Sequence, residues 1–150
     1  MANLKGKVET EIEIKVKPEK FFSIFRSQAY HVPNMAENIR GVDIHEGEWH
    51  SHGAIKTWKY TCEGKDEEFK EKVEFDHENK AVILNGVDGH VFEHFKSFKP
   101  VYQVIPKGEG SLAKLSIEYE KLSADVPNPD RYLAMMVNIT KHMDDNLIKT

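Results

Sequence analysis

One long amphipathic segment at the C-terminal end, preceded by a run of short alternating segments, most constrains the fold of this chain. Apolar side chains recur in that segment at three- and four-residue spacing: Tyr132, Met135, Met136, Ile139, Met143 and Leu147. Residues 127–130, Pro-Asn-Pro-Asp, are a helix-start signal, and no glycine or proline follows them. The pattern predicts one helix of about five turns, whose apolar face must be buried against another element.

The chain before this helix alternates between apolar and polar residues with the two-residue period of half-buried strands. Seven segments are predicted as strands: residues 8–16, 41–45, 55–62, 68–75, 81–84, 92–105 and 112–122. Turns are expected at residues 63–66, 76–79 and 106–110, where glycine, proline, asparagine or aspartate gather. Pro100 falls inside the sixth segment and predicts an edge position or a bulge, because proline cannot donate to a sheet ladder.

Two short helices are expected between the first and second strands. Pro18 suits a first helical position, and Phe21, Phe22, Ile24 and Phe25 follow it as a very apolar group. A second helix is expected at residues 32–36. Because neither piece is long enough to be stable alone, we expect a packed, V-shaped pair.

The order of these elements predicts one α+β domain over residues 1–150. In it, a curved, seven-stranded antiparallel sheet wraps around the long C-terminal helix. If the inward side chains do not fill the space inside such a sheet, they line an internal cavity for a small ligand.

Composition excludes several classes of protein. The chain is 39% hydrophobic, 10% aromatic and 31% charged, which is typical of a globular protein. No apolar run approaches the roughly 18 residues of a membrane span and no apolar signal segment is visible, so we expect a cytoplasmic protein without membrane insertion. A net charge of −4 and the lack of a basic-aromatic stripe argue against nucleic acid as a partner. The single cysteine, Cys62, can form no internal disulfide.

Five stretches, in order along the chain, resemble one plant family. They are GKVETEIEI at residues 6–14, HEGEW at 45–49, FKEKVE at 69–74, FKSF at 95–98 and LSIEYEKL at 115–122. Together with the order of elements, they resemble the major latex protein or ripening-related branch of the Bet v 1 (START-like) family. The resemblance implies a helix-grip fold, a hydrophobic small-molecule ligand in an internal cavity, and a role in plant defence or stress. It also implies catalysis in a few relatives.

The sequence departs from the pollen-allergen branch of that family in one loop. At residues 46–53, Trp49, His50 and His52 replace most of the glycines of a phosphate-loop-like turn, and only Gly47 and Gly53 remain. Because glycines allow backbone N–H groups to surround an anion, we expect no phosphate site here. The loop is expected to shape the rim of the cavity.

Parity along the strands, spacing along the helices and the resemblance assign a set of ligand-binding candidates. They are Phe25, His31, Trp58, Tyr60, Phe69, Glu71, Val82, Leu84, Phe98, Tyr102, Leu115, Ile117, Tyr119, Tyr132, Met135, Met136, Ile139 and Met143. An ordinary filled core would show the same pattern, and the resemblance favours a lined pocket. We expect the helix at residues 32–36 and the loops near Trp49 and at residues 86–89 to open it.

Glu71 is the leading candidate for a catalytic residue. A carboxyl group among apolar neighbours has a raised pKa and could act as a general acid or base. Lys56, Tyr60 and His31 are the other candidates for proton transfer. The alternative is that Glu71 has no catalytic role, and either forms an ion pair with Lys56 or lies at the solvent-exposed mouth of the pocket.

The histidines give no metal site. His45, His50 and His52 cluster, but Glu48 is the only nearby acid, and zinc needs three or four convergent ligands. No P-loop, Rossmann or Gly-x-Ser-x-Gly motif occurs, so no cofactor is expected.

Three functions remain open for the chain. The first is to bind, carry or buffer a hydrophobic or amphipathic small molecule (a plant metabolite, hormone or lipid-like compound) as a monomer or weak dimer. The alternative is a cofactor-free enzyme of the isomerase, cyclase or condensing type that uses the same pocket. The third is a storage or stress protein with a collapsed core.

Overall fold

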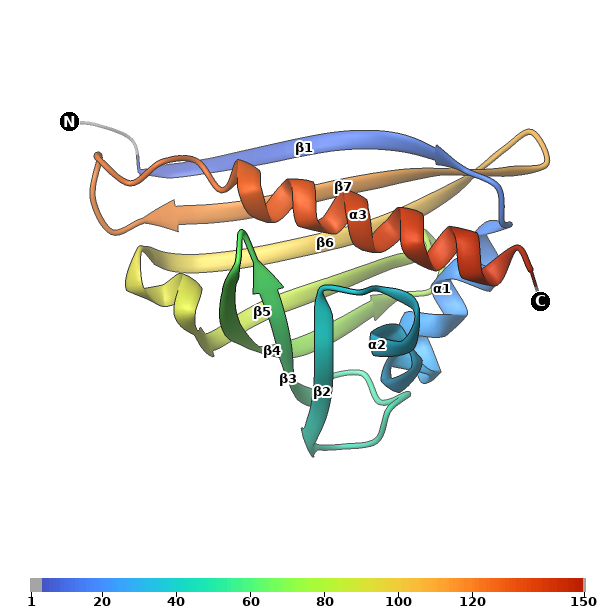
Figure 1. Ribbon diagram of the computed structural model, residues 1–150, viewed down its shortest axis with the longest axis horizontal. Helices are drawn as coiled ribbons and strands as arrows, with labels where there is room; N and C mark the ends of the chain where they lie inside the picture. Colours follow the sequence, from blue (N-terminus) through green and yellow to red (C-terminus); the bar gives the residue numbers. More distant parts are fainter. Residues whose placement is uncertain (1–3, 150) are drawn as a thin grey trace.

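In the computed structural model, which describes residues 4–149, one antiparallel sheet wraps around a long helix (Figure 1). Its strands are β1 (Lys5–Ile14), β2 (Ile39–Glu46), β3 (Ile55–Cys62), β4 (Lys65–Asp76), β5 (Ala81–Gly89), β6 (Phe95–Lys107) and β7 (Gly110–Lys121). Their spatial order is β1-β7-β6-β5-β4-β3-β2, and every neighbouring pair is antiparallel. The first strand therefore lies beside the last. This arrangement confirms the predicted seven-stranded α+β helix-grip fold.

The helices lie on one side of this sheet. They are α1 (Pro18–Ser27), α2 (Val32–Met35) and α3 (Asp130–Leu147), with short 3-10 helices η1 (Ala29–His31) and η2 (His90–Glu93). Figure 1 shows α3 running along the sheet, with α1 and α2 near its C-terminal end. Among residues 4–149, no helix is long and apolar enough to cross a membrane.

A buried carboxylate fixes the C-terminal half of α3 to the other end of the chain. Asp144 accepts hydrogen bonds from the backbone N–H groups of Lys15 (3.0 Å) and Val16 (3.0 Å), which follow β1. Ser111 donates to the carbonyl oxygen of Val16 (2.6 Å) and joins β7 to the same point. The helix is therefore attached where β1, β7 and the start of α1 meet.

The hairpin between β3 and β4 is tighter than predicted. Glu63 and Gly64 both have positive φ angles (50° and 79°), and Cys62 pairs directly with Lys65. Two central residues with positive φ match the twist of the flanking strands, so the strands need only a two-residue turn. As a result, β4 begins at Lys65 rather than at residue 68, and Glu67 becomes part of the sheet.

The prediction of a loop at residues 86–89 is wrong, because these residues continue β5. Gly86 pairs with Glu71, and a register shift between Lys70 and Glu71 accommodates the longer ladder. A Cβ atom at Gly86 would lie 2.6 Å from the carbonyl oxygen of Phe98 and 2.9 Å from the ring of Phe69. The glycine thus allows two elements of the core to approach closely.

The environment of Pro100 also differs from the prediction. The strand β6 lies inside the sheet between β7 and β5, and its register shift falls at Phe95/Ser97 rather than at Pro100. However, β5 pairs only with residues Val101 to Gln103 of β6. Pro100 lies just beyond this ladder, so its missing N–H is tolerated in an interior strand. The predicted strand at residues 92–94 is instead η2 and the residue that follows it.

Candidate functional site

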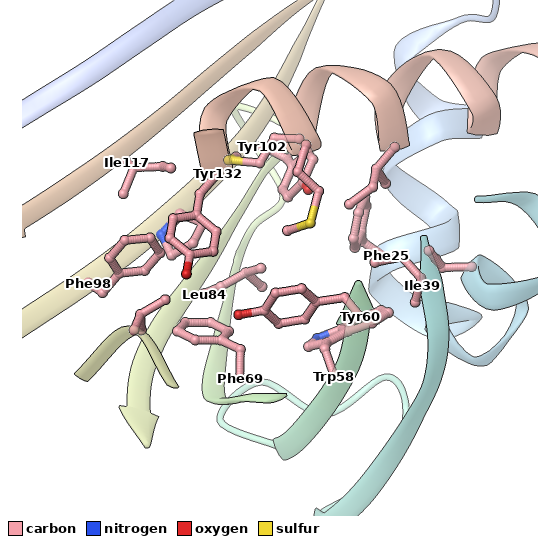
Figure 2. A pocket seen from close by; sticks show the side chains of 16 residues that line it. Phe25, Ile39, Trp58, Tyr60, Phe69, Leu84, Phe98, Tyr102, Ile117 and Tyr132 are labelled. Atoms are coloured by element: carbon pink, nitrogen blue, oxygen red, sulfur yellow. The ribbon is translucent and has the colours of Figure 1, made fainter. Parts of the chain in front are cut away.

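An apolar cavity of about 70 Å³ lies between α3 and the sheet (Figure 2). Sixteen residues line it: Phe25, Val32, Ile39, Trp58, Tyr60, Phe69, Leu84, Val91, Phe98, Pro100, Tyr102, Ile117, Tyr132, Met135, Met136 and Ile139. In Figure 2, side chains from the sheet surround the space below α3, and the hydroxyl ends of Tyr60 and Tyr132 approach each other. The wall is mostly carbon, as expected for a site that holds an apolar molecule.

Most of the predicted ligand-binding candidates lie on this wall. They are Phe25, Trp58, Tyr60, Phe69, Leu84, Phe98, Tyr102, Ile117, Tyr132, Met135, Met136 and Ile139. Their role in binding stays a prediction. Sequence reasoning missed Val32, Ile39, Val91 and Pro100, which lie in or beside the short helices or in segments whose structure was assigned incorrectly.

The other candidates are not on the wall. His31 is exposed and its ring packs against Tyr30. Tyr119 donates to Asn128 Oδ1 (3.1 Å) rather than into the cavity. The remaining four are buried elsewhere in the core: Glu71, Val82, Leu115 and Met143. Inward parity therefore identifies core residues, and only part of the core borders the cavity.

The cavity is small for a ligand site. Pockets that hold drug-sized ligands usually have about 300–1,000 Å³, several times the space present here. Met135 and Met136 of α3 lie on the wall, and methionine side chains adapt easily to new neighbours. Binding of any molecule larger than a few atoms therefore requires the wall to move.

A polar cluster stands at one part of the wall. Tyr60 of β3 and Tyr132 of α3 both donate to Oε1 of Glu67, at 3.0 Å and 2.7 Å. Arg131 donates to the Tyr132 hydroxyl (2.9 Å), and its Nη2 atom lies 4.0 Å from Glu67 Oε2. Glu67 is only 6% exposed. Burial and the Glu67 carboxylate raise the pKa of Tyr60 and that of Tyr132, so both hydroxyls keep their protons.

Sequence reasoning missed Glu67, although a signal for it existed. Glu67 has the same parity on β4 as Phe69 and Glu71, which were placed inward. The strand was expected to start at residue 68, after a four-residue turn. With the tight two-residue turn, the inward row extends by one more side chain.

Glu71 lies behind the wall and not on it. Its Oε1 atom accepts a hydrogen bond from the indole N–H of Trp58, while Oε2 has no hydrogen-bond partner among the described residues. Lys56 faces Glu71 across β3 and β4 but lies outside ion-pair distance. Burial raises the pKa of Glu71 to about 7, and both the positive charge of Lys56 and the Trp58 hydrogen bond oppose this rise. Burial lowers the pKa of Lys56.

Tyr102 supplies the least constrained polar group on the wall. Its ring packs against Phe25, with centroids 4.8 Å apart, and its hydroxyl makes no hydrogen bond within the described chain. Burial, and then the charge of Glu71, raise its pKa. The hydroxyl therefore stays neutral and free to bond to a ligand.

The loop at residues 46–53 is held mainly by contacts with β4 and with Tyr30 of η1. The N–H of Gly53 donates to the carbonyl of Val73 (2.7 Å), and His52 Nδ1 accepts the N–H of Phe75 (3.2 Å). His50 pairs with Glu48 at 3.3 Å, and the ring of Trp49 packs against Tyr30. Within residues 4–149, no three or more His, Cys, Asp or Glu side chains are arranged to hold a metal ion.

Comparison with known proteins agrees with this architecture. The model of the pathogenesis-related protein Bet v 1 family matches residues 3–150. MLP-like protein 328 of Arabidopsis thaliana is 40% identical over 146 residues, which are 96% of this chain and 97% of that protein. MLP-like protein 43 of the same plant is 38% identical over 151 residues, with 98% and 96% covered.

Solved structures give the same result. Ginseng major latex-like protein 151 from Panax ginseng superposes with a TM-score of 0.92 at 36% identity, covering 95% of this chain and 97% of that one. A point mutant of norcoclaurine synthase from Thalictrum superposes with a TM-score of 0.74 at 16% identity, covering 99% and 98%. At that identity the second likeness shows the fold alone.

Proposed function

The chain belongs to the pathogenesis-related protein Bet v 1 family, and we propose from this that it binds a hydrophobic or amphipathic small molecule between α3 and the sheet. The observation that carries the proposal is the apolar cavity between α3 and the sheet. A storage protein with a collapsed core would be expected to fill this space, because an unfilled cavity lowers the free energy of unfolding.

Entry of the ligand requires the wall to open near α2. This helix has only four residues, and two wall residues, Val32 and Ile39, lie in it or just after it. One hydrogen bond, from Asn146 Nδ2 to the carbonyl of Met35 (3.4 Å), ties it to α3. A helix of this length is held by its packing and not by its own propensity, so it moves at low cost. Met135 of the wall adapts to the occupant.

The biological role that follows is to carry or buffer the bound compound. We place this role in the cytoplasm, with the protein acting as a monomer or weak dimer in plant defence or stress. The bound compound would be a plant metabolite, a hormone or a lipid-like molecule.

A second candidate function is cofactor-free isomerisation, cyclisation or condensation in the same pocket. It is favoured by Glu71, which is buried, has one oxygen without a hydrogen-bond partner among residues 4–149, and has a pKa raised to about 7. Because Trp58 lies on the wall and bonds to Glu71, the indole must move before Glu71 can reach a substrate. Turnover that is lost in Glu71→Gln but kept in Glu68→Gln, an exposed residue of the same strand, would support the enzyme.

Native mass spectrometry of the protein purified from the tissue that makes it tests the binding function. We expect a retained small molecule that dissociates when the protein is denatured, and its absence from a variant with a filled cavity. A protein that carries no adduct and takes up no member of a panel of neutral hydrophobic compounds would overturn the proposal.

A further inference from the structure

The polar groups on the cavity wall are few, and most are tyrosine hydroxyls. Apart from the indole N–H of Trp58, they are the hydroxyls of Tyr60, Tyr102 and Tyr132, and no Lys, Arg, His, Asp or Glu side chain of the described chain lines the space. The Trp58 proton is already donated to Glu71, and the protons of Tyr60 and Tyr132 are donated to Glu67. These three protons are therefore unavailable to a ligand, which leaves the Tyr102 hydroxyl as the free donor on the described part of the wall.

The polar cluster around Glu67 can still accept a hydrogen bond from a ligand, although its tyrosines have no free proton to donate. A tyrosine oxygen can accept as well as donate. The Tyr132 oxygen already accepts from Arg131 (2.9 Å), whereas the Tyr60 oxygen accepts no hydrogen bond within residues 4–149. Tyr60 is 3% exposed, so water does not readily satisfy this oxygen. A ligand group that donates a hydrogen bond would use it.

The charged side chains of this region lie behind the wall and not on it. Two carboxylates, Glu67 and Glu71, stand on the inward row of β4 on either side of Phe69, which lines the cavity. The Arg131 guanidinium lies 4.0 Å from Glu67 Oε2, and Glu71 Oε2 has no hydrogen-bond partner in the described part of the chain. Neither Arg131 nor Lys56 reaches the wall. An anionic group inside the cavity would find no cation on the described part of the wall and would lose its hydration without an ion-pair partner, at a high cost of desolvation.

We propose that the ligand carries a hydrogen-bond donor, a hydroxyl or amino group, on an apolar body, and that the Tyr60 oxygen accepts this donor. The inference rests on the binding function proposed above and names the chemical class of its ligand. The bond extends a chain from the ligand through the Tyr60 hydroxyl to Glu67, and each bond of such a chain polarises the next. The same site rejects carboxylates of equal size.

Three compounds with one apolar body test the inference by calorimetric titration of the unmodified protein. These are 4-ethylphenol, which donates a hydrogen bond, 4-ethylanisole, which keeps the oxygen but cannot donate, and 4-ethylbenzoate, which is an anion. We expect the phenol to bind about tenfold more tightly than the anisole, the effect of one buried hydrogen bond. The benzoate is expected to bind more weakly than either.

Two variants identify the acceptor. In Tyr60→Phe, the preference for the phenol over the anisole should disappear. In Tyr119→Phe, whose hydroxyl bonds to Asn128 away from the cavity, the preference should remain. Circular dichroism verifies that both variants fold. If Tyr60→Phe does not fold, Tyr102→Phe decides: retention of the preference would leave Tyr60 as the acceptor, and its loss would assign the acceptor to the Tyr102 hydroxyl and overturn the inference.

The outcomes separate this inference from the binding function itself. Binding of none of the three compounds, or of any related hydrophobe, would overturn the binding function and the inference with it. Equal affinity for phenol and anisole, or tightest binding of the benzoate, would overturn the inference alone and leave an apolar carrier without this preference.

Discussion

Tyr60 and Tyr132 donate hydrogen bonds to the same carboxylate oxygen, Oε1 of Glu67, one from the sheet and one from the helix. Tyr60 comes from β3 and Tyr132 from the first turn of α3, and their ring centroids are 6.5 Å apart. The helix and the sheet are thus joined by a buried polar link at the edge of an otherwise apolar cavity. Opposite it, near the C-terminal end of α3, Asp144 makes the second polar link.

Removing one hydroxyl from this link should destabilise the fold without unfolding it. In Tyr132→Phe, the buried Glu67 loses a donor, and the free energy of unfolding should fall by about 1–3 kcal/mol. Urea denaturation measures this, with Tyr30→Phe, an exposed tyrosine, as the control. The double variant with Tyr60→Phe should be non-additive, because both hydroxyls serve one oxygen. Strictly additive losses would contradict a shared link.

The buried Glu71 predicts a pH-dependent difference in stability between the natural protein and Glu71→Gln. Below pH 4.5, the reference pKa, the carboxyl is protonated in both the folded and the unfolded state and costs nothing. As the pH rises from about 4.5 through 7, the unfolded state loses its proton first, so the natural protein loses stability. Relative to the natural protein, the Gln variant should therefore gain on the order of 3 kcal/mol between pH 4 and pH 8.

Chemical denaturation at several pH values checks this difference. Glu68→Gln, which changes an exposed carboxyl on the same strand, is the control and should show no such gain. If the Glu71→Gln difference does not change with pH, the carboxyl does not have the raised pKa assigned to it.

Asp144 should be essential for the position of α3. Asp144→Ala removes the acceptor of two backbone N–H groups, and we expect a loss of roughly 2–4 kcal/mol in the free energy of unfolding. Asp145→Ala, at the exposed neighbouring position, should cost much less. In hydrogen exchange, the amides of Lys15 and Val16 should lose protection in the first variant only. Similar protection of these amides in both variants would show that the carboxylate does not hold them.

Filling the cavity should abolish binding while the fold persists. Ile139→Phe adds volume at the wall, where about 70 Å³ is free, so the melting temperature should change little. Ligand affinity should fall by more than tenfold. Val137→Phe makes a larger side chain on the same helix at a half-buried position off the wall, and its affinity should stay close to that of the natural protein. Equal affinity in both variants would place the ligand elsewhere.

The sequence patterns predict the fold well and the site only in part. Two-residue alternation places Trp58, Tyr60 and Phe69 inside because a strand must put successive side chains on opposite faces. The same rule places Val82 and Leu115 inside, yet they pack in solid core. The position of the cavity depends on sheet curvature and on the path of α3, which no local pattern encodes. Sequence reasoning did not predict Glu67 as an inward residue, because the conformation of Glu63 and Gly64 decides where β4 begins.

The measurement that tests the central claim most directly is the fluorescence of Trp58 during titration with a transparent ligand. The chain has two tryptophans: Trp49 packs against Tyr30 and is not on the wall, while Trp58 lines the cavity. In Trp49→Phe, addition of 4-ethylcyclohexanol should produce a saturable change in Trp58 emission, and Ile139→Phe in the same background should remove it. Emission that stays constant at every concentration, or that changes equally with the cavity filled, would contradict ligand binding beneath α3.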